Sequence, residues 1–192
     1  RMLDMGFLPD MQFILDSVAQ DRQSFFFSAT MGRTVDGLIQ KFSNNPVTVS
    51  VKTGDTSDNV HQNVVHYTSK EDKIEKLHDA LIQDHVKKVI IFDETQRSVE
   101  RLNTELASRG FATDAIHGGK TQGQRQRALK KFKETDIDIL VATDVAARGI
   151  DVKDITHVIN YGLPQTYEDY THRIGRAGRA GKTGYALTFI TK

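Results

Sequence analysis

Three arginines stand at three-residue intervals in the stretch YTHRIGRAGRAGKTG, residues 170–184. Arg173, Arg176 and Arg179 alternate with glycines, which disfavour a continuous helix. Guanidinium groups bind phosphate and carboxylate oxygens in a forked geometry. The residue types and their spacing therefore predict a site for an anion with several negative oxygens.

The end of the same stretch imitates a phosphate-binding P-loop. Gly181, Lys182 and Thr183 match the last three positions of the pattern G-x-x-x-x-G-K-[ST], but the first glycine falls where this chain has Arg176. A P-loop also opens a helix, whereas this stretch runs into the predicted strand YALTFI. We therefore interpret the Gly-Lys-Thr sequence as a glycine turn with a basic tip.

Three further polar clusters follow predicted buried strands. They are FDET at residues 92–95, HGGKTQGQR at 117–125 and ATDVAARGID at 142–151. Ligands gather at the carboxyl ends of parallel strands, so all three clusters should open onto one edge of a sheet. Gly118 and Gly119 allow backbone N–H groups to approach an anion closely. The hydroxyls that can reach phosphate oxygens belong to Thr95, Thr121 and Thr143.

Local charge supports an anion at this edge. Between Gly118 and Lys133 there are six Lys or Arg residues and no acidic residue. Each cluster taken singly is better explained as an ordinary strand-to-helix turn with a solvated helix after it. Three such clusters on one rim reverse that preference and favour binding.

The elements that must position these clusters alternate regularly from about residue 60 onward. Runs such as VIIF and ILVA are apolar on both faces, which is typical of a parallel sheet covered by helices on both sides. We therefore predict a doubly wound α/β domain over residues 60–192. Its six strands are expected at residues 60–68, 88–92, 111–117, 138–143, 156–161 and 185–191.

Residues 1–51 predict part of another domain. An amphipathic helical pattern interrupted at Pro9 precedes the apolar run SFFFSAT, which indicates a buried strand. A helix from about Thr34 to Phe42 and the strand VTVSV at residues 47–51 follow, and residues 52–59 form a polar linker. Without its parent sheet, SFFF has an unpaired edge, so we expect the chain to associate with another copy or aggregate.

Composition excludes several classes of function. The chain has 192 residues, with 26 Lys and Arg against 25 Asp and Glu, so net charge does not identify a partner. The absence of cysteine excludes disulfides, thiolate metal sites and a cysteine nucleophile. The seven histidines show no metal-ligand spacing, so we expect no metal site. No apolar run reaches the length of a membrane span, and we expect a cytoplasmic protein without membrane contact.

Five motifs, taken in order, resemble those of DEAD-box RNA helicases. They are SAT at residues 28–30, IFDET at 91–95, Gln122 with Arg125, ATDVAARGID at 142–151 and HRIGRAGR at 172–179. The opening RMLDMGF is similar to the segment that follows the D-E-A-D tetrapeptide in that family. The run YTHRIGRAGRAGKTGYALTF resembles bacterial members. The resemblance covers nearly the whole chain.

The resemblance implies two RecA-like domains that close over ATP and bend single-stranded RNA across their shared rim. This chain would supply the second domain, residues 60–192, preceded by the tail of the first, residues 1–51. The P-loop and the D-E-A-D acids that hold Mg²⁺ belong to the first domain and are not in this sequence. We therefore expect no ATP hydrolysis or unwinding by these residues alone.

By similarity, several residues would contact ATP from the second domain. Asp151, next to Gly149 in its motif, would bind the ribose. Arg179 would be the arginine finger on the γ-phosphate, with Arg176 supporting it across the gap between domains. His172 would be a partner of the motif that couples the nucleotide site to domain closure. In this chain alone we expect both finger-region arginines to point into solvent.

The resemblance also assigns residues to RNA and to coupling. The RNA-backbone path would be lined by Thr95, Gly118, Gly119, Gln122, Arg125 and Thr143. The coupling motif would consist of Ser28, Ala29 and Thr30. Hydroxyls, backbone amides and arginine address phosphate and sugar rather than bases, which predicts binding with little sequence preference.

Two other functions remain open at this point. Three basic loops are sufficient for a non-catalytic RNA-binding or interaction module, although Asp151 and the aligned arginines would then have no task. A DNA-directed translocase of the same superfamily is a nearer alternative. Stimulation of ATP hydrolysis by RNA compared with DNA separates these possibilities.

Overall fold

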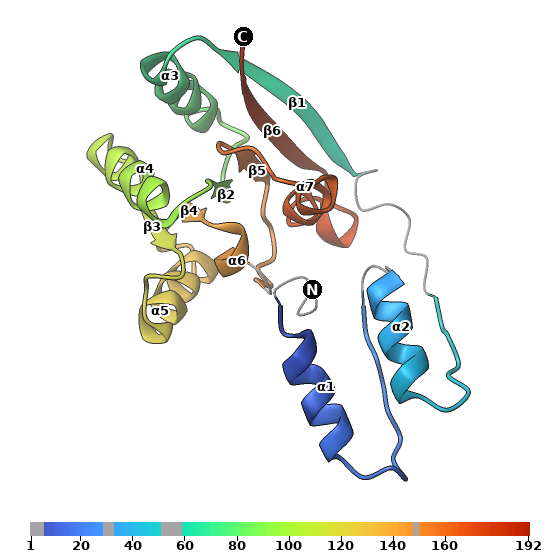
Figure 1. Ribbon diagram of the computed structural model, residues 1–192. Coiled ribbons are helices and arrows are strands. Elements are labelled where there is room, and N and C mark those ends of the chain that lie inside the picture. The colour runs from blue at the N-terminus through green and yellow to red at the C-terminus, as the bar shows by residue number, and fades with distance from the viewer. Residues whose placement is uncertain (1–5, 29–32, 51–58, 148–149) are drawn as a thin grey trace. The chain divides into compact units, whose positions relative to one another are not determined.

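The computed structural model describes residues 6–28, 33–50, 59–147 and 150–192 (Figure 1). Two compact units divide the chain, Arg1–Lys52 and Thr53–Lys192. The second unit contains all the strands of the described residues, and it carries the polar clusters that follow those strands.

The second unit is built on a six-stranded, all-parallel sheet with the order β1-β6-β5-β2-β4-β3. The predicted α/β fold with a parallel sheet is therefore confirmed. The middle of the sheet is formed by β5, β2 and β4, which are short and buried along their whole length. The strands are β1 (Val60–Tyr67), β2 (Val89–Phe92), β3 (Thr113–Ile116), β4 (Ile139–Ala142), β5 (His157–Asn160) and β6 (Gly184–Thr191).

Helices cover both faces of the sheet, as Figure 1 shows. Alternate residues of β2 point to opposite faces: Ile90 and Phe92 belong to one core cluster, Val89 and Ile91 to the other. The first cluster is completed by α5 and α6, and the second by α3 and α4. The helices are α3 (Lys70–Leu81), α4 (Gln96–Ser108), α5 (Gln122–Lys133), α6 (Asp144–Ala147) and α7 (Tyr167–Ile174), with a 3₁₀ turn η1 (Arg179–Gly181).

Helix α7 closes a third, smaller core over the two long strands. Ile174 packs with Val60 of β1 and Ala186 of β6, and Tyr170 lies against this group. The chain leaves α7 at Gly175, makes the turn that holds the arginines, and enters β6 at Gly184. The position of the arginines is thus set by two elements that are themselves anchored in the sheet.

The first unit contains α1 (Leu8–Ser17) and α2 (Arg33–Phe42). Pro9 lies in the first turn of α1, where its missing N–H costs no helical hydrogen bond. None of the residues of α1 is buried, whereas Leu38 of α2 is. Both helices predicted from the sequence in this unit are therefore present.

The two strands predicted for the first unit are wrong. Residues 24–28 and 47–50 form no strand, and Phe27 and Val47 are 93% and 89% exposed. A strand exists only when a neighbour pairs with its backbone groups. The described residues of this unit offer no such neighbour, so the two runs form no strand and most of their apolar side chains stay exposed.

No helix within the described ranges has the length and apolar character needed to cross a membrane. The described residues also contain no group of three or more His, Cys, Asp or Glu side chains able to hold a metal ion.

Candidate functional site

The carboxyl ends of the strands carry the three polar clusters, because every strand of the sheet runs in the same direction. Phe92, Ala142 and Asn160 are aligned across β2, β4 and β5, and Ile116 of β3 is opposite Ala142. The residues that follow these positions therefore emerge at one edge of the sheet. The arginine turn, the segment between Gly175 and Gly184, instead precedes β6 and packs against the first residues of β1 and β6.

The arginine turn is fixed by two glycines that allow backbone to touch backbone. A Cβ on Gly184 would lie 2.4 Å from the backbone nitrogen of Gly178 and 2.7 Å from Cβ of Ala177. Gly178 has φ +67°, and a Cβ there would lie 2.9 Å from Val60 Cγ2. Only glycine fits both positions without a shift of the backbone. The first residues of β1 and β6 therefore serve as the support against which the turn is folded.

Arg173 is buried, and its guanidinium group is hydrogen-bonded inside the protein. Its side chain is 1% exposed, and Nε and Nη2 donate to the two carboxylate oxygens of Asp144 at 2.7 Å each. Nη1 donates to the carbonyl oxygen of Gly162 at 2.6 Å and to Oδ1 of Asn160 at 3.1 Å. The guanidinium group also lies 5.0 Å from the centre of the Phe92 ring. This arginine joins α7 to α6 and to the ends of β2 and β5, and it is not available to an anion.

Arg176 and Arg179 lie together with Asp151. Arg176 Nη1 donates to the carbonyl oxygen of Ile150 at 2.9 Å, one residue before Asp151. Arg179 Nε donates to the carbonyl oxygen of Gly175 at 3.0 Å, and its Nη1 lies 3.3 Å from Asp151 Oδ1. The structure therefore brings the three predicted ATP-contacting side chains into one place.

The expectation that Arg176 and Arg179 point freely into solvent is wrong. Each guanidinium donates to a backbone carbonyl oxygen, because a guanidinium has five N–H donors and nearby carbonyl groups accept them readily. The Asp151 carboxylate is nevertheless 85% exposed, and the Arg179 side chain is 37% exposed. The anchored groups thus keep part of their surface open to a ligand.

His172 lies on α7, one residue before the buried Arg173, and its Nε2 is 3.9 Å from Glu168 Oε1. Ser28 is the last described residue before the gap at 29–32. Ala29, Thr30 and Gly149, also predicted as site residues, lie outside the described residues.

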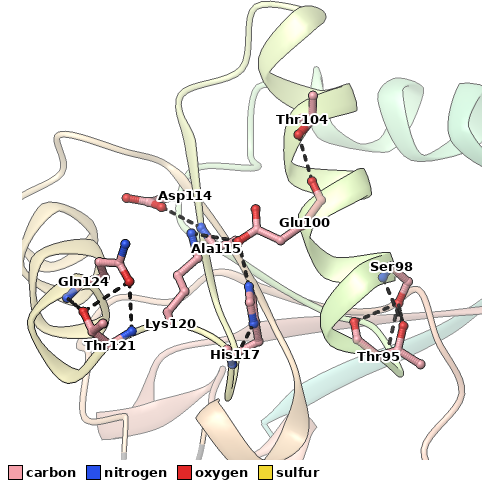
Figure 2. A network of polar contacts seen from close by, with 11 residues as sticks. Thr95, Ser98, Glu100, Thr104, Asp114, Ala115, His117, Lys120, Thr121 and Gln124 are labelled. Atoms are coloured by element: carbon pink, nitrogen blue, oxygen red, sulfur yellow. Dashed lines mark hydrogen bonds and ion pairs between the residues drawn. The ribbon is translucent and has the colours of Figure 1, made fainter.

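Thr95 and Thr121 begin the helices that follow β2 and β3 (Figure 2). Thr95 Oγ1 accepts the N–H of Ser98 at 3.0 Å, and Ser98 Oγ accepts the N–H of Thr95 at 3.1 Å. Thr121 and Gln124 form the same reciprocal pair, with hydrogen bonds of 3.3 and 2.8 Å. Both threonines therefore act as N-caps, which explains their place after a strand without reference to a ligand.

The other predicted RNA contacts lie close to these caps. Gln122 and Arg125 are in the first turn of α5, directly after Thr121. Thr143 is 8% exposed at the start of α6, and its carbonyl oxygen accepts the N–H of Ala147. Gly118 and Gly119 form the turn between β3 and α5, where the Gln96 side chain packs against them. The rim therefore presents one basic helix start and one glycine turn.

The family profile described as helicase conserved C-terminal domain matches residues 69–181. The chain belongs to this family. The matched region begins just before α3 and ends at the last residue of η1. It therefore includes the turn at Gly118 and Gly119 as well as Arg173, Arg176 and Arg179.

Relatives of this helicase domain are DEAD-box proteins. The chain is 46% identical over 194 residues to the DEAD-box ATP-dependent RNA helicase CshA of Bacillus licheniformis, covering 100% of this chain and 39% of that protein. Among solved structures, a DEAD box protein from Methanococcus jannaschii is 39% identical with a TM-score of 0.65, covering 100% of this chain and 51% of the other. The DEAD-box resemblance and the RecA-like fold expected from the sequence are therefore confirmed.

A second solved structure shows a relative of this helicase domain with ligands. Dbp5 of S. cerevisiae, bound to RNA and ADP BeF3, is 29% identical with a TM-score of 0.84, covering 100% of this chain and 51% of the other. The chain thus spans 39% of the curated relative and about half of each of these two solved chains.

The sequence did not predict the positions of two polar residues of the helicase domain, Arg173 and His117. Arg173 was grouped with the anion-binding arginines, although its neighbour Ile174 and its spacing to the partly buried Tyr170 and the buried Ala177 mark a core-facing position. His117 was not singled out, although it directly precedes two glycines after a buried strand. For both residues the position relative to buried neighbours, rather than the residue type, indicates that the side chain lies inside the domain.

Proposed function

We propose that this chain is the second RecA-like domain of an ATP-dependent RNA helicase, together with the end of the first, and that it contributes one side of a composite ATP site. One observation carries the proposal: Arg179 lies beside Asp151 on an exposed rim, while the neighbouring Arg173 is fully used inside the domain. An exposed arginine held on a fixed turn is suited to a ligand that arrives with another domain.

The side chains present fit one side of a nucleotide. A carboxylate accepts hydrogen bonds from hydroxyl groups, so Asp151 suits a ribose, while the forked donors of Arg176 and Arg179 suit phosphate oxygens. Mg²⁺ bound with ATP on the first domain neutralises phosphate charge. Phosphoryl transfer depends on positioning and charge stabilisation, so an arginine from a mobile domain makes hydrolysis depend on domain closure.

RNA would bind along the edge of the sheet where β2, β3 and β4 end. Dbp5, which shares the fold at a TM-score of 0.84, is bound to RNA. In this chain the N-terminal turn of α5 presents Gln122 and Arg125, and the N-terminus of a helix attracts phosphate. We assign the backbone contacts to these two residues and to Thr95, Gly118, Gly119 and Thr143.

The first unit completes the proposal. Residues 1–51 would be the C-terminal part of the first RecA-like domain, and residues 52–59 the linker between the domains. Phe25 and Phe27 are 71% and 93% exposed, as expected for a run whose partner strands are in the rest of that domain. The motif Ser28–Ala29–Thr30 would couple the nucleotide site to closure, with His172 as its partner. We place the protein in the cytoplasm.

The first experiment measures RNA-stimulated ATP hydrolysis by the 192-residue chain and by a version extended with a complete first RecA-like domain. The chain alone is expected to show no activity, and the extended protein to hydrolyse ATP. Turnover by the 192 residues alone contradicts the proposed composite site.

The second experiment tests the RNA path with a matched pair of variants on α5. Arg125→Ala should weaken binding of a single-stranded RNA and lower the slope of log affinity against log salt by about 0.7, the value for one lost phosphate contact. Arg127→Ala, two residues away on the same helix, is the control and should retain more of the affinity. Equal losses in the two variants exclude a specific role for Arg125.

A third experiment separates the RNA helicase from a DNA translocase. Stimulation of ATP hydrolysis by single-stranded RNA should exceed stimulation by DNA of the same sequence, because only RNA offers 2′-hydroxyl groups to the contacts. Stronger stimulation by DNA overturns the RNA assignment.

A further inference from the structure

The glycine turn after β3 is closed by its own neighbours (Figure 2). The N–H of Gly119 donates to Nδ1 of His117 at 3.1 Å. Lys120, the only charged residue of the turn, is 2.9 Å from Glu100 of α4. The amide and the ammonium group best placed to meet a phosphate are thus both engaged within the protein.

The tautomer of His117 follows from these contacts. Because Nδ1 accepts a backbone N–H, the ring proton of the neutral imidazole lies on Nε2. Nε2 is 2.7 Å from Glu100 Oε1, to which it donates. The imidazole is only 8% exposed, so its orientation is set by these two partners. Glu100 therefore determines which nitrogen faces Gly119.

Protonation of His117 breaks the hydrogen bond between the imidazole ring and the backbone of the turn. In the imidazolium both ring nitrogens carry hydrogens, so Nδ1 no longer accepts the Gly119 N–H and the two N–H groups repel each other. The Gly119 N–H must then rotate away from the ring, and it becomes available to another hydrogen-bond acceptor. Glu100, already in contact with Nε2, stabilises the positive ring.

The carboxylate nearest to the imidazole favours its protonated form. Glu100 from α4 faces it directly, and hydrogen bonding from His117, together with Lys120, lowers the pKa of Glu100 against the opposing effect of burial. Asp114 of β3 accepts the N–H of Ala115 and pairs with Lys131 of α5 at 3.7 Å. Glu100 is therefore the carboxylate in direct contact with the ring.

We propose that His117 is a positioning residue that closes the Gly118–Lys120 turn when neutral and opens it to an RNA phosphate when protonated. The inference rests on the proposed RNA-binding function of this edge. In the closed state the Gly119 N–H is held by Nδ1. In the open state the Gly119 amide is released for the phosphate and the imidazolium adds a positive charge beside the turn, so RNA binding takes up a proton.

Two substitutions separate the two contacts of the ring. In His117→Asn, Oδ1 occupies approximately the place of Nδ1, accepts the Gly119 N–H and cannot titrate, so the turn stays closed. In His117→Gln, Nε2 replaces the ring Nε2 as donor to Glu100, and the Gly119 N–H has no acceptor, so the turn stays open. Both variants are neutral, and comparison of the two removes the effect of losing the imidazole itself.

The test is equilibrium binding of a fluorescent single-stranded RNA to the chain at a series of pH values from about pH 8 down to about pH 6. The parent chain should gain about tenfold in affinity as the pH falls, one charge-assisted contact being of this size. H117Q, which frees the amide without the charge, should bind more tightly than H117N at every pH, and neither variant should show the pH dependence of the parent. His66→Gln, on the far edge strand β1, is the control and should retain the pH dependence of the parent.

A second readout does not depend on RNA. In NMR spectra without RNA, the Gly119 amide should shift in step with the titration of His117, and this shift should be lost in H117N and H117Q. A Gly119 amide that does not follow His117, or a pH dependence retained in both variants, overturns the proposal. An amide that follows His117 in a chain that binds no RNA at either pH overturns the proposed RNA function instead.

Discussion

Two arginine–aspartate pairs connect the α7 region to the segment after β4, and they differ in burial and geometry. Arg173 and Asp144 are joined by two hydrogen bonds of 2.7 Å, with the arginine side chain 1% exposed. Arg179 and Asp151 share a single contact of 3.3 Å, with exposed fractions of 37% and 85%. The same two residue types thus form a structural pair and an open pair, with the arginines six and the aspartates seven positions apart.

The difference shows how burial decides the role of an arginine. A buried guanidinium is no longer hydrated, so its N–H groups need hydrogen-bond acceptors within the protein. The acceptors of Arg173 are Asp144, Asn160 and Gly162. A surface ion pair contributes about 0–1 kcal/mol, so its partner is readily exchanged for a more highly charged one. Arg173 is therefore fixed, whereas Arg179 can leave Asp151 for a phosphate.

The comparison is tested most strongly by removing the exposed arginine. In an extended protein that hydrolyses ATP, Arg179→Ala should reduce RNA-stimulated hydrolysis by about 10³ to 10⁵, the contribution of an arginine finger. Stability should change by less than about 0.5 kcal/mol, because the side chain is partly exposed and its ion pair weak. Arg109→Ala, which removes a surface arginine paired with Glu75 and Glu105, is the control. Unchanged turnover in the Arg179 variant excludes the finger assignment.

Removing the buried arginine should produce the opposite result for stability. Arg173→Met leaves the Asp144 carboxylate and two further acceptors without their donor, so the free energy of unfolding should fall by about 3 kcal/mol. The measurement is denaturant unfolding of the second unit, followed by circular dichroism. Arg179→Met, the same change at the exposed pair, should have little effect. Similar losses in the two variants would remove the distinction between the pairs.

The turn that separates the two arginines can be tested through its glycine support. Gly184→Ala places a Cβ 2.4 Å from the backbone nitrogen of Gly178, so it should destabilise the domain by about 1–3 kcal/mol. Gly123→Ala is the matched control, because it lies in α5 with no atom within 4 Å of the new Cβ. That change should leave stability unchanged or raise it slightly. A stable Gly184→Ala variant would show that the turn tolerates movement.

The smallest effect is expected at Lys182, the residue that imitates a P-loop lysine. It pairs with Asp154 at the surface, where both side chains are largely exposed. Lys182→Ala should change the free energy of unfolding by less than about 0.5 kcal/mol and leave ATP hydrolysis near its original rate. The measurement is the same unfolding and hydrolysis assay. A large loss of hydrolysis would give this lysine a role in phosphate binding that the turn does not predict.

Much of the second unit could be predicted from its sequence. Runs such as VIIF and ILVA are buried on both faces, and this pattern requires a covered parallel sheet. Parallel strands then bring the segments that follow them to one edge, which predicted that Thr95, Thr121 and Thr143 would lie on the same side of the sheet. These features depend on the local pattern of apolar residues, which a sequence displays directly.

The features that were missed depend on partners distant in the chain. SFFF and VTVSV have the composition of strands, but no described neighbour pairs with them. Arg173 has the same residue type as Arg176, and its buried partners include Asp144, which lies 29 positions earlier in the chain. Thr95 and Thr121 were predicted as phosphate contacts, and their roles as helix caps became clear only with the geometry of Ser98 and Gln124.

The place of β6 in the sheet also has a consequence for the order of folding. It follows the other five strands in the chain, yet it lies between β1 and β5, with Val60 opposite Gly184. During synthesis β1 has no partner until β6 has emerged, and contacts between such distant segments form slowly because a long loop must close. The arginine turn, which rests on the first residues of both strands, is therefore shaped late. A nascent chain can therefore fold this turn only after β6 has been synthesised.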